Sequence, residues 1–358
     1  MIRYKGLLVA RRHMTNIITI KKPTDCHIHL RDDAYLKRTV ADAAAQFNTI
    51  VVMPNLTPPI AAIEDALSYR QRILNAVPAT DKLNPLLNLY LHKGTTATLV
   101  KDVANTPYIL GFKLYPRGAT TNSDAGIDDI SQFYNIFAAM EKHNVPLMIH
   151  AEDNSPTTDI FDRECFFIDK HITKLHKAFP ELKITLEHIT TKEAVEFINE
   201  SPANLAATIT AHHLWINRND VINTKIKPHN FCLPIAKRKE HQQALIDAAT
   251  SGNSKFFLGT DSAPHTQEDK ETACGCAGIY TAKNAIELYA EIFDNKGALS
   301  QLEGFASING PHFYNFSPAN DTIEITKRQQ KIEDKLEFGA SIVVPFKSNE
   351  QINWSLAS

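Results

Sequence analysis

The chain is dominated by a regular alternation of short apolar runs, rich in β-branched residues, with longer stretches that carry apolar residues at three- and four-residue spacing. The first pattern is typical of buried strands and the second of amphipathic helices. Strands that alternate with helices pair in parallel, because each helix returns the chain to the start of the sheet. We expect eight strands, at residues 17–29, 49–53, 84–91, 108–115, 145–150, 183–188, 205–211 and 255–259.

Eight such units predict an α/β fold with one closed (β/α)8 TIM barrel. A doubly wound open sheet is the alternative. The phosphate-binding motifs GxGxxG after the first strand and GxxxxGK[ST] are both missing from the sequence, which weakens the nucleotide-binding form of that alternative. The amphipathic stretches predict helices at 35–47, 64–76, 126–143, 192–200 and 237–250.

The organisation of the chain predicts one domain. Residues 1–13 carry basic side chains, contain no acid and lack the apolar core of a secretory signal, and Met14 offers a second start. We therefore expect residues 1–13 to be an extension outside the fold. Residues 14–358 are expected to form the barrel, with a β-rich tail after Tyr314.

Composition excludes several classes of protein. Lys plus Arg number 38 and Asp plus Glu number 40, so the net charge of −2 indicates neither a nucleic acid nor a membrane surface as the main partner. The five cysteines do not form the pattern of a disulfide framework. We expect a cytoplasmic protein with reduced thiols. Four of the cysteines lie close in sequence to the candidate site residues below, and we interpret them as packing residues: Cys26, Cys232, Cys274 and Cys276.

Barrel enzymes place their chemistry at the carboxyl ends of the strands. His27 and His29 end the first expected strand, and residues two apart on a strand point to one face, so both can reach one metal ion. His150, His188 and Asp261 end three further strands. Taken singly, each residue is more typical of a satisfied core or surface position. Together they indicate a divalent metal site with nitrogen and oxygen ligands, such as zinc.

Lys113 lies in the apolar strand 108–115, where a charged ammonium is costly unless it is paired. Desolvation lowers the pKa of an amine, and a neutral amine can capture CO2 as an anionic carbamate. From this residue alone, an ordinary salt bridge or a solvent-facing lysine remains the simpler alternative.

The residues above belong to longer motifs through which the chain resembles the amidohydrolase superfamily and, within it, the dihydroorotases of the shorter bacterial type. The resemblance runs from about residue 16 to 339 and rests on His27 to Asp32 (HIHLRD), Met53 to Asn55 (MPN), Phe112 to Pro116 (FKLYP), Ala119 to Ser123 (ATTNS), His150 to Asp153 (HAED), Leu186 to Thr190 (LEHIT) and Gly259 to His265 (GTDSAPH).

The resemblance implies a centre of two zinc ions. His27, His29 and Asp261 would hold the more buried ion, His150 and His188 the more exposed one, and a carboxylated Lys113 would bridge them. A bridging hydroxide would be the nucleophile and Asp261 the general acid and base. The implied reaction is the reversible closure of N-carbamoyl-L-aspartate to L-dihydroorotate and water in pyrimidine synthesis.

The resemblance also implies a grip on the substrate. Arg31, Asn55 and His265 would hold its free carboxylate, and the backbone of Leu233 and Ala277 would bind the ring. Residues 117–126 would form a lid whose Thr120 and Thr121 reach the substrate, and His150 would contact it as well. A homodimer is also implied. His212 and His213 are interpreted as structural residues rather than ligands.

Three alternatives stay open at this point. Another cyclic amidase, such as a hydantoinase, dihydropyrimidinase or allantoinase, would use the same chemistry on a ring without this carboxylate. A one-metal purine deaminase would not need Lys113 in the metal centre. A catalytically inactive scaffold is disfavoured because every candidate ligand is present.

Overall fold

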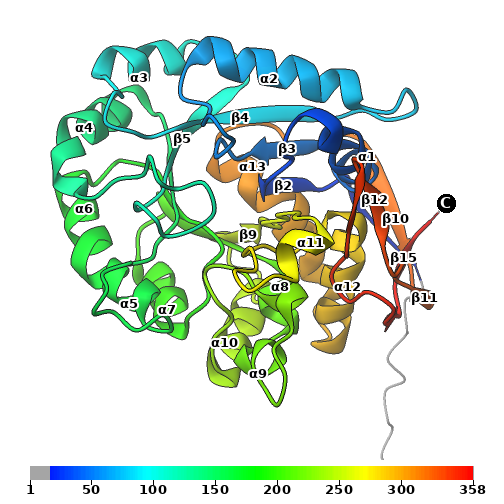
Figure 1. The fold of residues 1–358 in the computed structure, drawn as a ribbon. Helices are drawn as coiled ribbons and strands as arrows, with labels where there is room; N and C mark the ends of the chain where they lie inside the picture. The colour runs from blue at the N-terminus through cyan, green and yellow to red at the C-terminus, as the bar shows by residue number, and fades with distance from the viewer. Residues whose placement is uncertain (1–16, 358) are drawn as a thin grey trace, which may run out of the picture.

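A computed structural model describes residues 17–357 of the protein (Figure 1). The predicted extension at residues 1–13 therefore lies outside the described residues. The centre of the fold is an eight-stranded parallel sheet in the order β2-β3-β4-β5-β6-β7-β8-β9, which follows the order of the chain. These strands are β2 (Thr24–Ile28), β3 (Thr49–Val52), β4 (Asn84–Tyr90), β5 (Ile109–Leu114), β6 (Leu147–Ile149), β7 (Ile184–Leu186), β8 (Leu205–Ile209) and β9 (Phe256–Leu258).

The sheet curves into a barrel that closes between β2 and β9. No regular ladder joins these two strands, but the Asp261 amide donates to the His27 carbonyl (2.8 Å) and the His29 amide donates to the Ser262 carbonyl (3.1 Å). The closure therefore falls on residues of the predicted metal site. The predicted (β/α)8 barrel is confirmed.

Helices surround the barrel (Figure 1). Their apolar faces pack on the strands; α7, for example, begins after the capping hydroxyl of Thr191 and buries Ala194, Val195 and Ile198. The α-helices are α1 (Leu36–Gln46), α2 (Ile63–Ala76), α3 (Ala97–Ala104), α4 (Tyr134–His143), α5 (Arg163–Phe167), α6 (Thr173–Ala178), α7 (Lys192–Glu200), α8 (Ala211–Trp215), α9 (Arg218–Val221), α10 (Lys239–Thr250), α11 (Gln267–Lys270), α12 (Ala285–Asn295) and α13 (Asn309–Phe313). Within the described residues, none of the helices is long and apolar enough to cross a membrane.

Two expected elements differ in the structure. The strand expected at 17–29 is two strands, because Pro23 has no amide hydrogen for a ladder. Its first half, β1 (Ile17–Lys21), pairs antiparallel with β10 (Thr322–Thr326) outside the barrel. The helix expected at 126–143 begins only at Tyr134, after a 3-10 turn over Ile130–Phe133 that the Asp129 carboxylate caps.

The chain ends in short strands packed beside the barrel, next to α1 and α12 in Figure 1. They are β10, β11 (Gln330–Lys331), β12 (Leu336–Phe338), β13 (Ser341–Val343), β14 (Gln351–Ile352) and β15 (Ser355–Leu356). The sequence predicted a β-rich tail after Tyr314, and strands begin there at Thr322.

Side chains alternate in direction along each barrel strand, so they divide between an apolar core outside the barrel and a smaller one inside it. Phe112 and Leu114 of β5 join the large apolar layer between strands and helices, whereas Lys113 between them faces the other way. Its register partner on β6 is Met148, which belongs to a smaller cluster with Val51. Lys113 therefore places an amine inside the barrel.

Candidate metal centre and substrate cavity

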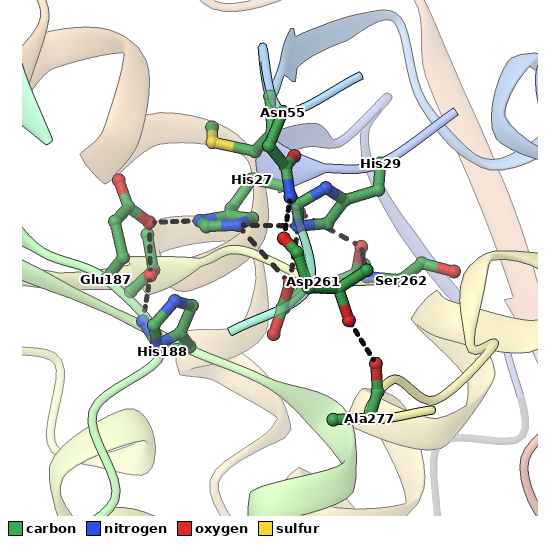
Figure 2. A network of polar contacts seen from close by, with 12 residues as sticks. His27, His29, Asn55, Glu187, His188, Asp261, Ser262 and Ala277 are labelled. Carbon is green, nitrogen blue, oxygen red and sulfur yellow. Dashed lines mark hydrogen bonds and ion pairs between the residues drawn. The ribbon is translucent and has the colours of Figure 1, made fainter. Parts of the chain in front are cut away.

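Three side chains converge where β2 and β9 end. His27 Nε2 lies 3.4 Å from His29 Nε2 and 3.3 Å from Asp261 Oδ1, and His29 Nε2 lies 3.0 Å from the same oxygen. Figure 2 shows the three groups turned toward one another. Ligand atoms that bind one tetrahedral zinc ion lie about 3.3–3.6 Å apart. The two separations from His27 match ligands of a single ion, and the contact between His29 and Asp261, at 3.0 Å, is somewhat shorter.

Glu187 sets the orientation of the His27 ring from the side opposite its metal-facing nitrogen. Its Nδ1 lies 2.8 Å from Glu187 Oε2, and the same carboxylate oxygen accepts a 2.7 Å hydrogen bond from the Thr208 hydroxyl. A carboxylate on Nδ1 leaves Nε2 as the nitrogen that binds a metal ion. The Thr208 hydroxyl also accepts the amide of His188, so β7 and β8 are joined behind the site.

Three residues of the site have a strained backbone. Arg31, His188 and Asp261 all have positive φ, at 60°, 43° and 45°, a region that non-glycine residues seldom adopt. Gly259 lets the strands approach here, because a Cβ on it would lie 2.7 Å from the Thr208 side chain. Such strain persists only where the surrounding structure holds it, and it is concentrated at functional sites.

His188 and His150 extend the group. His188 offers a ligand atom within 4.8 Å of those of His27 and Asp261, and its ring centroid lies 4.8 Å from that of His150. His150 Nε2 lies 2.8 Å from Glu152 Oε2, which leaves Nδ1 as its free nitrogen. Both histidines are buried and line the same small cavity as His27, His29 and Asp261.

Lys113 is wholly buried, and its Nζ has no hydrogen-bond partner among the described residues. Burial lowers the pKa of this amine to about 8. Glu187 Oε1, Glu152 Oε1 and His188 Nδ1 are likewise buried without a partner in the described part of the chain. Such atoms carry a desolvation cost unless a further group satisfies them, and metal ions with a bridging anion would do so.

Arg31 and His265 form the rim of the site. The guanidinium of Arg31 donates to the Pro264 carbonyl (2.9 Å) and to His265 Nε2 (3.0 Å). Burial and the neighbouring Arg31 lower the pKa of His265 to about 2, so this imidazole is neutral and accepts from Arg31. The remaining guanidinium hydrogens are free to bind an anion.

The segment 117–126 covers the metal site as a closed flap. The Asn55 side-chain amide donates to the Thr121 carbonyl (3.0 Å), the Asn122 amide donates back to the Asn55 carbonyl (3.1 Å), and the Thr121 hydroxyl donates to the Ala277 carbonyl (3.4 Å). Thr120 lines the cavity beneath it. Asn55, predicted to bind the substrate, here holds the lid.

The lid separates two cavities. The inner one, which the metal-site residues line, has a volume of ≈ 20 Å³, enough for about one water molecule. The outer one measures ≈ 580 Å³ and shares Arg31 and Thr121 with the inner one. A single six-membered ring with a carboxylate is larger than the inner cavity, so the lid segment would have to open for such a molecule to enter.

Leu233 and Ala277, which the resemblance implies as substrate-binding residues, line the inner cavity. Lys270, which the sequence did not single out, holds together the two segments that carry Leu233 and Ala277. Lys270 Nζ donates to the carbonyls of Phe231 (2.9 Å), Cys276 (2.9 Å) and Gly278 (2.6 Å). The only sequence signal for this role is a lysine close after the GTDSAPH run, at the end of the short helix α11.

The chain matches the Amidohydrolase family over residues 22–328. The dihydroorotase of Pseudomonas syringae pv. syringae is 50% identical to it over 343 residues, which cover 96% of this chain and 99% of that protein. The chain belongs to the dihydroorotase family. Among solved structures, the dihydroorotase of Campylobacter jejuni has a TM-score of 0.89 and 36% identity, with 97% of this chain and 99% of that one covered.

A second solved dihydroorotase, from Saccharomyces cerevisiae in complex with 5-fluoroorotic acid, has a TM-score of 0.88 and 34% identity over 96% of this chain and 99% of that one. These likenesses confirm the resemblance inferred from the motifs. They place the chain among dihydroorotases rather than among the other cyclic amidases or deaminases that the sequence left open.

Two further members of the site follow from the geometry. Glu187 and Glu152 are buried carboxylates directly behind His27 and His150. Glu152 lies within the motif HAED and Glu187 within the motif LEHIT, but the sequence does not show which histidine either carboxylate contacts. The signal for Glu187 was its place next to His188, but its contact with His27 joins residues 160 positions apart.

Proposed function

We propose that the chain catalyses the reversible, zinc-dependent closure of N-carbamoyl-L-aspartate to L-dihydroorotate and water, in de novo pyrimidine synthesis. The observation that carries the proposal is the convergence of His27 Nε2, His29 Nε2 and Asp261 Oδ1 inside a barrel that also buries an unpaired Lys113 amine. Family membership supports the reaction class.

The metal centre in this proposal has two zinc ions. His27, His29 and Asp261 would hold one, His150 and His188 the other, and Lys113 would contribute as a carbamate between them. The donor atoms are nitrogen and oxygen, which zinc accepts. When bound, the ions would lower the pKa of a water toward about 7 and polarise the amide carbonyl.

Asp261 moves the proton. Its Oδ1 faces His27 and His29, and its second oxygen is left to hold a proton. In ring opening this carboxylate accepts the proton of the attacking water and returns it to the departing ring nitrogen. In ring closure Asp261 accepts the proton of the attacking nitrogen and delivers it to the departing water.

Arg31, Asn55 and His265 orient the substrate through its carboxylate. Arg31 presents unused donors at the junction of the two cavities, and neutral His265 holds its guanidinium in place. The yeast relative was solved with 5-fluoroorotic acid, a ring that bears a carboxylate. Bidentate contact between a guanidinium and a carboxylate adds both energy and orientation.

The lid and the two segments that carry Leu233 and Ala277 complete the pocket. Thr120 and Thr121 close over the ring, His150 contacts it, and the backbone of Leu233 and Ala277 binds its polar edge. Asn55 would exchange its bond to the Thr121 carbonyl for one to the substrate. Closure excludes water from the reacting amide.

Three broader expectations belong to the same proposal. Residues 14–358 form one catalytic domain with its C-terminal tail, and residues 1–13 are an extension. The protein works in the cytoplasm, where its thiols stay reduced. It assembles as a homodimer and takes no nucleic acid or membrane as a partner.

The test is metal content together with turnover. Protein supplied with zinc and bicarbonate should bind two metal ions in the barrel mouth, beside His27 and His150, and consume dihydroorotate, followed in the ultraviolet. His29→Ala should lose both properties, whereas His143→Ala, at the end of α4, should keep them. Fewer than one metal per chain without turnover in the unmodified protein would refute the proposal.

A further inference from the structure

A second cluster of potential ligands lies behind the segment that carries Leu233. His212, His213 and Cys232 are all buried, and each offers one ligand atom within 4.8 Å of the others. His212 and His213 lie on α8, which the Thr210 hydroxyl caps. Cys232 comes from the loop between α9 and α10, so two separate segments build the cluster.

The distances within this cluster resemble those of a metal site. Cys232 Sγ lies 3.5 Å from His213 Nε2, and the Pro234 carbonyl oxygen lies 2.9 Å from that nitrogen and 3.4 Å from the sulfur. A thiolate and an imidazole on one tetrahedral zinc ion lie about 3.5 Å apart. The 2.9 Å contact is a hydrogen bond that His213 Nε2 donates to the Pro234 carbonyl, and a metal ion bound at Nε2 would replace it.

His212 gives an independent reason to expect a ligand. It has no exposed surface, and neither of its ring nitrogens has a hydrogen-bond partner among the described residues. Burial holds its pKa well below the ordinary value, so the imidazole is neutral, the form that binds metals. A buried imidazole without partners is costly unless something else satisfies it.

We propose that His212, His213 and Cys232 form a separate binding site for a borderline-soft divalent metal ion such as Zn²⁺ or Co²⁺. The sequence favoured structural roles for all three residues, because nothing in their spacing shows that Cys232 meets α8. Imidazole and thiolate together select such ions over calcium or magnesium.

Binding releases one proton to solvent, from the Cys232 thiol, whose pKa burial raises to about 12. At His213 the proton moves from Nε2 to Nδ1 and the imidazole stays neutral. The Thr210 hydroxyl, 2.8 Å from Nδ1, can donate or accept, so either tautomer is satisfied. An occupied site would fix Leu233, which sits between Cys232 and Pro234 and lines the inner cavity.

Cobalt tests this site without relying on turnover. Because the residues of the centre at His27 and Asp261 offer only nitrogen and oxygen, a sulfur-to-cobalt charge-transfer band in the near ultraviolet does not come from that centre. Variants of the individual thiols then show whether it comes from Cys232. In the full-length protein titrated with Co²⁺, we expect this band to saturate at one ion beyond those of the main centre. We expect Cys232→Ala to abolish it.

Two variants control the experiment. His212→Gln should weaken cobalt binding at this site at least about tenfold, while the double variant Cys274→Ser, Cys276→Ser should keep the band. No band at cobalt saturation, or a band that survives in folded Cys232→Ala, would overturn the proposal. If Cys232→Ala does not fold, the cobalt affinity of His212→Gln tests the proposal, and an affinity equal to that of the unmodified protein would overturn it. A band in protein without dihydroorotate turnover would refute the proposed function and leave this site standing.

Discussion

The floor and the rim of the active site are built in different ways. The floor, His27, His29, Lys113, His188 and Asp261, comes from the ends of barrel strands and is buried. The rim, Arg31, Asn55, Thr121, His265 and Ala277, comes from the loops beyond them. Floor residues are held by buried carboxylates such as Glu187, whereas rim residues are held by one another across the closed lid.

This difference separates their tasks. The contacts of the floor need not change during the reaction, because Glu187 and Thr208 hold His27 from the side away from the cavity. The bonds between Asn55 and the lid must break when a substrate enters, since the inner cavity holds only ≈ 20 Å³. We therefore expect floor variants to lower kcat and metal content, and rim variants to raise KM.

The largest effect is expected for Lys113→Ala. Removal of the amine removes the anion that would join the two metal sites, so kcat should fall by about a thousandfold or more and metal content should drop. Steady-state kinetics and elemental analysis measure both, with exposed Lys174→Ala as the matched control. Two metals at full occupancy in Lys113→Ala would show that the floor does not need this residue.

Arg31→Ala should give the largest effect of the rim. Loss of the charged partner of a carboxylate in a closed pocket costs roughly 2–5 kcal/mol, so kcat/KM on dihydroorotate should fall by about 30- to 4,000-fold, mainly through KM. Metal content should stay at the level of the unmodified protein. Arg70→Ala, which removes a guanidinium stacked on Tyr108, is the control. Unchanged kinetics would contradict the role of Arg31 in binding the carboxylate.

Lys270→Met should raise KM about tenfold, because three carbonyls lose their donor and the segments of Leu233 and Ala277 are no longer joined. Lys270→Arg should restore part of the loss.

Burial lowers the pKa of Lys270 to about 8, so deprotonation as the pH rises through 8 weakens the same bonds. KM of the unmodified protein should rise there, and in Lys270→Arg that rise should disappear. A tenfold loss in kcat with KM unchanged would place Lys270 in the floor instead.

Asn122→Ala should have the smallest effect. It removes one hydrogen bond of the closed lid, which contributes roughly 0.5–1.5 kcal/mol, so KM should rise by about 2- to 12-fold. Hydrogen exchange of residues 117–126 should become faster, while exposed Asn105→Ala leaves it unchanged. Unaltered exchange in Asn122→Ala would mean that other contacts hold the lid closed.

The floor could be predicted from the sequence, because strand geometry places residues two apart on one face and brings strand ends together. His27 with His29, and Lys113 within an apolar run, are readable by this rule. The motifs of the family supplied the rim residues, which the rule does not reach.

What the sequence did not show depends on long-range contacts. The pairing of β1 with β10, the carboxylate of Glu187 behind His27, and the meeting of Cys232 with α8 each join segments distant in the chain. Lys270 looked like an ordinary charge at the end of a short polar helix, and only its three carbonyl partners reveal its burial.

The most direct test of the floor is anomalous diffraction from crystals grown with zinc and bicarbonate. We predict two zinc peaks per chain in the barrel mouth, one beside His27, His29 and Asp261 and one beside His150 and His188. Continuous density should join both to the Nζ of Lys113. A single peak, or an unmodified Lys113 between two peaks, would contradict the account.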